Sequence, residues 1–130
     1  MAQKPIELIL MRQLASTLAM PIFLVDADGI LVFYNEPAER VLGKRFEETG
    51  EMPPTEWASA WTPTEADGTP LPAERLPLSI AVAERKPAHG DFWIRGLDGT
   101  RRHIQATAFP LMRTHDQVLG AVAIFWEMPS

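Results

Sequence analysis

The chain has 130 residues, a formal net charge of −5 and no cysteine. This length fits one domain that buries a core without disulfides or metal. The lack of cysteine excludes disulfides, thiolate catalysis and cysteine-ligated zinc. The acidic balance argues against a nucleic-acid partner, because the binding of phosphates requires a basic face.

The first 21 residues are largely apolar but include Glu7, Arg12 and Gln13. Their longest uncharged run is shorter than the ~20 residues of a membrane span. They also lack the apolar centre and cleavage site of a secretory signal. We therefore expect a cytoplasmic protein that does not associate with a membrane.

Residues 5–19 suit an amphipathic helix, with Pro5 in its first turn and Pro21 ending the segment. Its apolar positions at helical spacing are Ile6, Ile9, Leu10 and Leu14, widened by Leu8, Met11, Ala15 and Leu18. A stripe this broad exceeds what one contact needs. The helix either caps its own domain alone or also packs on a partner chain. We therefore divide the chain into a capping or dimerisation helix, 1–19, and a domain, 20–128.

A hairpin and a capped helix follow. Residues 21–26 form an apolar run typical of a strand that is buried on both faces. Asp28-Gly29 is a hairpin signal, and residues 30–34 form the second strand. Asn35 suits the N-cap of a short helix, because its side chain can accept a hydrogen bond from an amide of the first turn. Gly43 suits the C-cap.

Residues 44–77 are predicted to be irregular. Half of the 12 prolines lie in this part of the chain, together with Trp57 and Trp61. Proline at this density prevents long helices, whereas the tryptophans argue against a disordered linker. We expect short helical turns packed onto the body, followed by a helix over 76–86.

Three strands complete the chain. They are predicted over 90–97, 100–112 and 118–127, and Asp98-Gly99 forms the turn between the first two. The last run is apolar at nearly every position, which favours a central place in the sheet. We predict an α+β fold with five antiparallel strands, in which 21–26 and 118–126 lie side by side.

Several of these runs resemble PAS domains. FLVDADGILVFYNEPAERVLGK resembles the family's opening strand, D-x-D-G turn, second strand and first helix. DGTPLPAERLPLSIAVAER resembles the proline-rich entry into its connecting helix, and LDGTRRHIQATAFPL with VLGAVAIFWE resembles its last hairpin and closing strand. The resemblance covers roughly residues 19–127. It implies short helices and one longer connecting helix on one face of the sheet, with the N-terminal helix on the other face.

The resemblance also implies an output domain or a partner protein. The closing strand of the family commonly exits through an Asp-Ile-Thr-like triplet into a linker, whereas this chain has Glu127-Met128-Pro129 at that place. The residues leave open whether the chain is a fragment of a longer sensor or a free-standing module.

No group of residues suggests catalysis. The carboxylate pairs Asp26/Asp28 and Glu47/Glu48 suit a turn and a solvated surface. The three histidines have no spacing that indicates a shared metal: His89, His103 and His115. We predict that the protein is not an enzyme and binds no metal.

The resemblance implies which residues would hold a cofactor, so the sequence can be checked for them. Light-sensing members attach flavin through a cysteine, which this chain lacks. Haem-binding members commonly use a histidine on the connecting helix, and residues 76–86 contain none. Flavin held without a covalent bond, stacked on Trp57, Trp61 or Trp93, stays open, although tryptophan is more often simply part of a core.

The resemblance also assigns the two faces of the last strands. The inner set is Ile104, Ala106, Ala108, Ala121, Ala123 and Phe125. This alanine-rich face is either filled by the short helices or leaves room for a small apolar or aromatic metabolite. The candidate lining residues are Leu24, Phe46, Trp57, Trp61, Val82, Phe92, Ile94, Ala106 and Ala123.

The outward set forms an apolar patch that a monomer rarely exposes. It contains Trp93, Phe109, Val122, Ile124 and Trp126. The helix over 5–19, laid across this patch, would bury much of it, and the surplus apolar stripe of the helix would meet that of a second copy. We predict a homodimer whose candidate interface residues are Ile6, Ile9, Leu10, Leu14, Val122, Ile124 and Trp126.

Two functions follow as hypotheses. The first is a sensory module that binds a small ligand or a partner and signals through the geometry of its homodimer. The second is a structural dimerisation or protein-interaction domain with a filled core and no ligand.

Overall fold

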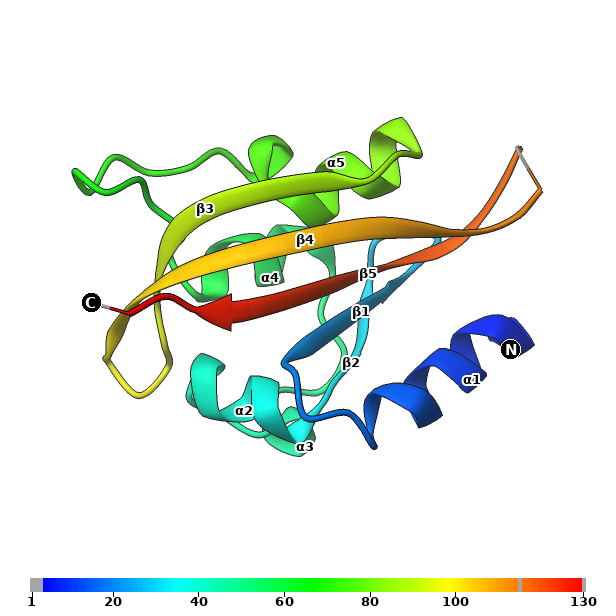
Figure 1. Cartoon of the computed structure of the whole chain (residues 1–130), viewed down its shortest axis with the longest axis horizontal. Helices are drawn as coiled ribbons and strands as arrows, with labels where there is room; N and C mark the ends of the chain where they lie inside the picture. Colours follow the sequence, from blue (N-terminus) through cyan, green and yellow to red (C-terminus); the bar gives the residue numbers. More distant parts are fainter. Residues whose placement is uncertain (1–3, 115, 130) are drawn as a thin grey trace.

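The structure, a computed structural model, describes residues 4–114 and 116–129 (Figure 1). Its elements in chain order are α1 (Ile6–Ala15), β1 (Ile22–Asp26), β2 (Leu31–Tyr34), α2 (Glu36–Leu42), α3 (Phe46–Thr49), α4 (Pro54–Ala60), the short 3₁₀ helix η1 (Ala73–Arg75), α5 (Pro77–Glu84), β3 (Ala88–Arg95), β4 (Arg101–Thr114) and β5 (Gln117–Glu127). The predicted order of elements is confirmed.

The strands form one five-stranded antiparallel sheet in the order β2-β1-β5-β4-β3. The pairing of β1 with β5 runs from Ile22 opposite Ile124 to Asp26 opposite Gly120. The two most apolar strands are therefore neighbours, as predicted. Gly120 permits this approach, because a Cβ there would lie 2.3 Å from the carbonyl oxygen of Val25.

Two groups of buried side chains lie on opposite faces of the sheet. The inner core lies between the sheet and helices α2–α5, and includes Phe23, Val25, Trp57, Trp61, Ile104, Ala106, Ala123 and Phe125. The outer core lies under α1 and consists of Leu8, Ala15, Ile22, Leu24, Val32 and Val122. Successive residues of a strand point to opposite faces. The predicted faces of β4 and β5 are therefore confirmed.

The side chain of Asn35 connects α1, β1 and α2 through hydrogen bonds. Its side-chain oxygen accepts from the amide of Ala38 at 3.2 Å, so the predicted N-cap is confirmed, and also from the amide of Ile22 at 2.9 Å. Its Nδ2 donates to the carbonyls of Ala15 at 2.9 Å and Met20 at 2.8 Å. One buried amide side chain thus fixes α2, β1 and the end of α1 together. The predicted C-cap is also confirmed, since Gly43 has φ of 82°.

Helix α1 ends at Ala15, four residues before the predicted end at 19. The hydroxyls of Ser16 and Thr17 donate to the carbonyls of Gln13 and Leu14. Such local bonds compete with the helical pattern and end it early. No helix among the described residues is both long enough and apolar enough to span a membrane.

Ion pairs attach the start of α1 to the sheet. Arg113, in β4, donates from Nε and Nη2 to the two carboxylate oxygens of Glu7, at 3.0 Å each. The Arg113 guanidinium holds the pKa of the Glu7 carboxyl below its ordinary 4.5. Lys4 makes a longer contact with Asp26, at 3.4 Å.

The segment over 61–64 covers part of the free side of β3. The amides of Thr64 and Trp93 each donate to the other residue's carbonyl at 2.8 Å, and the amide of Arg95 donates to the carbonyl of Trp61 at 2.8 Å. The predicted irregular region therefore packs onto the body, as expected, and it extends the sheet by one short stretch.

Candidate functional site

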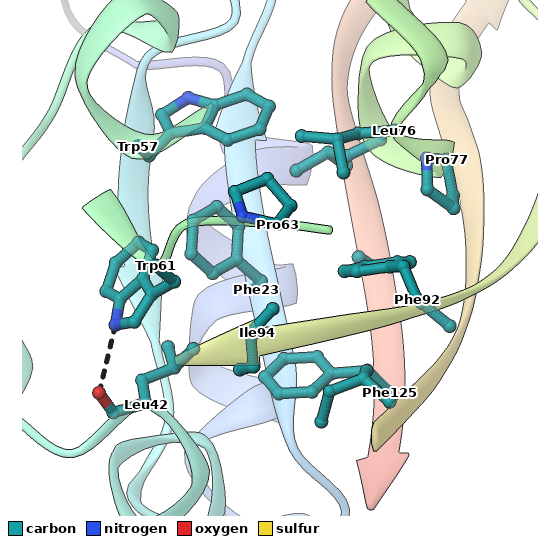
Figure 2. A pocket seen from close by; sticks show the side chains of 14 residues that line it. Phe23, Leu42, Trp57, Trp61, Pro63, Leu76, Pro77, Phe92, Ile94 and Phe125 are labelled. Carbon is teal, nitrogen blue, oxygen red and sulfur yellow. Dashed lines mark hydrogen bonds between the residues drawn. The ribbon is translucent and has the colours of Figure 1, made fainter. Parts of the chain in front are cut away.

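A cavity of about 90 Å³, partly open to the surface, lies at the inner core. Figure 2 shows side chains from β1, α4, the segment after α4, α5, β3 and β5 arranged around it. Six of the nine predicted lining residues border it: Trp57, Trp61, Phe92, Ile94, Ala106 and Ala123. The alanines of β4 and β5 leave the room, because larger side chains at these inward positions would occupy it.

Aromatic side chains hold one wall of this cavity. The Phe23 ring meets the Trp57 ring edge-on, with centroids 5.6 Å apart, and the Trp61 ring edge-on at 5.9 Å. Edge-to-face pairs of this kind are favourable because the positive edge of one ring faces the negative face of the other. The wall is therefore built from rings that fix one another's orientation.

Both tryptophans direct their polar atoms to the backbone. The indole N–H of Trp57 donates to the carbonyl of Gly29 at 2.8 Å. Figure 2 shows the corresponding bond of Trp61, whose indole N–H donates to the carbonyl of Leu42 at 2.9 Å. All the other lining side chains are aliphatic, phenyl or proline groups. The cavity thus offers apolar contact and carries no side chain that could transfer a proton or ligate a metal.

Three predicted lining residues lie elsewhere. Leu24 belongs to the outer core, so its assignment to the cavity was wrong; the adjacent Phe23 takes the inward position. Phe46 packs edge-on against Phe33 and Tyr34. Val82 packs against the inner core without bordering the cavity.

Sequence reasoning missed several lining residues. They include Phe23, Leu42, Pro63, Leu76, Leu78 and Phe125. Phe125 already belonged to the predicted inward set, so the alternation of β5 could have identified it. Pro63 and Leu76 come from the irregular region, which has no periodicity to place them.

Trp93 lies on the outer face, where its ring stacks on His103 with centroids 4.6 Å apart. It cannot join Trp57 and Trp61 around one flavin ring. The cavity is also far smaller than the ~300–1,000 Å³ typical of ligand pockets, and it offers no polar partner to flavin or to haem propionates. The residues present do not fit either cofactor.

The predicted interface residues separate into two groups. Ile6, Leu10 and Leu14 are 65%, 55% and 51% exposed, and Ile9 is also exposed. Val122 is only 1% exposed, because Leu8 and Ala15 of the chain's own α1 cover it; its assignment to a partner interface was wrong. Ile124 packs partly against the same outer core, and Trp126 is half-buried.

The histidines of the sequence analysis are separated in the fold. His89 and His103 lie on β3 and β4, and His103 contacts the carboxylate of Asp91. His115 lies outside the described residues. Within 4–114 and 116–129, no three His, Asp or Glu side chains are grouped to hold a metal.

Comparison by sequence finds no family model and no curated protein that matches the chain. Solved structures do match. A LOV protein of Rhodobacter sphaeroides superposes with a TM-score of 0.75 at 12% identity, over 96% of this chain and 69% of that one. The PAS domain of BvgS from Bordetella pertussis gives 0.62 at 15% identity, over 95% and 87%.

A third match is the PAS domain of the nitrogen regulation protein NR(II) from Vibrio parahaemolyticus, with a TM-score of 0.62 at 12% identity, over 92% of this chain and 98% of that one. Sequence identities this low establish a shared fold but not a shared function. Together with the strand order and the helices over one face of the sheet, they show that the chain has the PAS fold.

Proposed function

We propose that the chain is a cytoplasmic, non-catalytic signal-transduction module that holds a small apolar or aromatic molecule in its inner cavity and signals through the geometry of a homodimer. The observation that carries the proposal is the apolar cavity inside a PAS fold. Similar structures include the PAS domain of a nitrogen regulation protein and the LOV domain of a blue-light activated histidine kinase. These neighbours support a role in sensing.

The size and lining of the cavity limit its ligand. An engineered cavity of about 150 Å³, lined by aliphatic and phenyl groups, stays dry and binds benzene. The present cavity, at about 90 Å³, is smaller. It suits a molecule of no more than one aromatic ring, with the lining side chains adjusting around it. A hydroxyl or carboxyl group on that molecule would lose its hydrogen bonds to water without replacement.

The exposed stripe of α1 supports the dimer. Ile6, Leu10 and Leu14 lie on the side of the helix that does not face the sheet. Apolar residues grouped in this way favour a partner surface. Burial of ~500 Å² of apolar surface per chain is worth roughly 12 kcal/mol at about 25 cal/mol per Å², before the costs of association.

Strand β1 offers a route from the cavity to that stripe. Phe23 borders the cavity, whereas its neighbours Ile22 and Leu24 pack under α1. A ligand that displaces the Phe23 ring therefore acts on the strand that carries the helix. A change in the angle of α1 would alter the arrangement of the two copies.

The ligand is tested by mass spectrometry of natively purified protein and by thermal unfolding with benzene, toluene and phenol. We expect benzene and toluene to raise the melting temperature, and phenol to raise it less because its hydroxyl would be unpaired. Ala106→Val, which fills the cavity, should remove the benzene effect. If no molecule co-purifies and no aromatic compound stabilises the protein, the ligand-free dimerisation domain is the better description.

The dimer is tested by light scattering. Leu10→Glu and Leu14→Glu should give monomers, whereas Thr55→Glu, which adds the same charge at an exposed position of α4 on the other face of the sheet, should remain dimeric. A dimer that survives these changes would rule out α1 as the interface.

Transmission is tested on the same helix. The chain has no cysteine, so Lys4→Cys, just before α1 and outside its apolar stripe, accepts a single spin label. The distance between the two labels in the dimer should change when benzene binds. An unchanged distance with benzene bound would contradict signalling through dimer geometry while leaving the ligand site intact.

A further inference from the structure

A second hollow lies outside the inner core, between the segment after α4 and the β3–β4 hairpin. It is an open cleft of about 340 Å³. Its lining includes the side chains of Arg95 and Arg101, together with Thr62, Thr64 and Asp67. The cleft is thus polar where the cavity is apolar, and the sensing proposal makes no use of it.

The two arginines are direct cross-strand neighbours. Arg95 of β3 lies opposite Arg101 of β4 in the sheet register. Directly opposite residues share a face, with Cβ atoms about 4.5–5.5 Å apart, and like charges placed in this way are destabilising. Both side chains are exposed, so the solvent screens part of this repulsion. The pair still places two positive charges side by side in a chain with a net charge of −5.

Neither guanidinium has a carboxylate partner within 4 Å among the described residues, although the nearby Arg102 pairs with both Asp98 and Glu127. Arg95 donates from Nη1 to the carbonyl of Gly99 at 2.8 Å. Arg101 donates from Nη2 to the carbonyl of Ala66 at 3.2 Å. Each contact uses one of the five N–H donors of a guanidinium.

The guanidinium of Arg101 is held in a second way. Its central carbon lies 4.2 Å from the centroid of the Trp93 ring, a cation–π contact. Both arginines are therefore oriented by the protein and keep unused donors. A planar, oriented fork of donors is the group that proteins use to bind carboxylate and phosphate.

The acidic residue of the cleft is engaged elsewhere. The Asp67 carboxylate accepts from the amide of Thr69 at 2.9 Å, and hydrogen bonds from Thr69 lower the pKa of Asp67. Asp67 makes no ion pair with either arginine at 4 Å or less. The cleft thus carries two cations, one anion and the hydroxyl groups of Thr62 and Thr64.

We propose that this cleft binds a small oxyanion, a carboxylate or a phosphate, through the guanidinium groups of Arg95 and Arg101, which both line it. The anion would relieve the repulsion between the two cations and accept from their unused donors. The site is separate from the apolar cavity and does not depend on the sensing proposal.

The cleft and the cavity share a wall, which gives the anion a structural consequence. Trp61 and Pro63 border the cavity, whereas Thr62 and Thr64 border the cleft, and Ile94 borders both. An anion that bridges the hairpin and this segment would hold 61–64 against β3 and so steady one side of the cavity.

The test is a two-dimensional NMR titration of the full chain with sodium phosphate, sodium succinate and sodium acetate, each at constant pH and ionic strength. We expect saturable shifts in the amides of 62–68 and 95–101. Saturation by phosphate alone identifies a phosphate site, and saturation by the carboxylates alone identifies a carboxylate site. No saturable shift with any of the three would overturn the proposal.

Substitutions separate a site from general attraction of anions. Arg95→Gln should weaken binding by about tenfold or more, the size expected for loss of a charge-assisted hydrogen bond. Arg75→Gln, which removes the same charge from an exposed position of η1 outside the cleft, should bind as the parent does. Equal weakening by both variants would show screening instead of a site. Arg101→Lys, which keeps the charge but loses the planar fork, should fall between them.

Discussion

The inner and outer cores lie on opposite faces of one sheet, share β1 and β5, and differ in how they are filled. The outer core is aliphatic, and α1 covers it closely. The inner core is rich in aromatic rings and alanine and contains the cavity. The small inward alanines of β4 and β5 leave space beside the rings, whereas the aliphatic side chains under α1 pack against one another. The comparison indicates that the outer core attaches the helix and the inner core retains space.

The largest expected effect is the loss of stability when a leucine is replaced by alanine in each core. Leu24→Ala in the outer core should lower the free energy of unfolding by about 3 to 5 kcal/mol, because a packed site loses all its contacts. Leu78→Ala, which borders the cavity, should cost about 2 kcal/mol, because that side chain already lacks neighbours on one side. Urea unfolding measures both. Equal losses would show that the cavity closes in solution.

The second prediction removes the Asn35 side chain, whose hydrogen bonds connect α1, β1 and α2. Asn35→Ala leaves the carbonyl of Met20 and the amide of Ile22 without this partner, and it removes one of the two hydrogen bonds to the carbonyl of Ala15. It should therefore cost about 2 to 3 kcal/mol. Hydrogen exchange should also increase in α1. Asn35→Ser, which retains an N-cap acceptor for α2, should be less destabilising but should free α1 similarly. If the amides of α1 exchange as slowly in both variants as in the parent, Asn35 does not hold the end of α1 in place.

The third prediction tests whether the cavity of the inner core lies beside Ala106. Ala106 and Ala108 both point inward from β4, but only Ala106 borders the cavity. Ala106→Val should be neutral or stabilising by up to about 1 kcal/mol, since it fills a void with a good strand former. Ala108→Val should destabilise by about 1 to 3 kcal/mol through overpacking. If Ala108→Val melted at a higher temperature than Ala106→Val, the cavity would not lie beside Ala106.

The smallest effect concerns the ion pair that holds α1 over the outer core. The pKa of Glu7 is lowered in the folded protein, chiefly by its hydrogen bond from Arg113. The unfolded chain therefore takes up a proton first as pH falls. The contribution of the pair is complete above the ordinary pKa of 4.5 and disappears as pH falls through the lower folded value.

Glu7→Gln should remove this dependence. The difference in urea midpoint between the parent and the variant should be present at about pH 6 and shrink at about pH 3. The cavity contributes nothing to this pH dependence, because it borders no titratable side chain. A difference that grows as the solution becomes more acidic would contradict the assignment.

Much of the fold could be predicted because local signals agreed with one another. Asp28-Gly29 marked the first hairpin, Asn35 its capped helix, and the alternation in β4 gave the correct faces. Strand β1 is apolar at consecutive positions, so periodicity could not tell whether Phe23 or Leu24 faces inward. The register with β5 decides this, since Phe23 lies opposite the inward Ala123.

The cavity wall was harder to predict, because long-range contacts set it. Trp61 reaches the carbonyl of Leu42, and Trp57 reaches that of Gly29, which lies 28 residues away. Neither partner carries a sequence signal for that contact. The outward position of Trp93 was available from alternation, since Phe92 and Ile94 were both assigned inward, and this argued against a flavin held by all three tryptophans.

The short stretch that pairs with β3 has a consequence for how the molecule behaves in a crowded solution. A bare strand at the margin of a sheet recruits other chains and seeds aggregates. Here Thr64 occupies the amide and carbonyl of Trp93, and Trp61 occupies the amide of Arg95. Variants that detach this stretch should therefore precipitate while most of the domain is still folded.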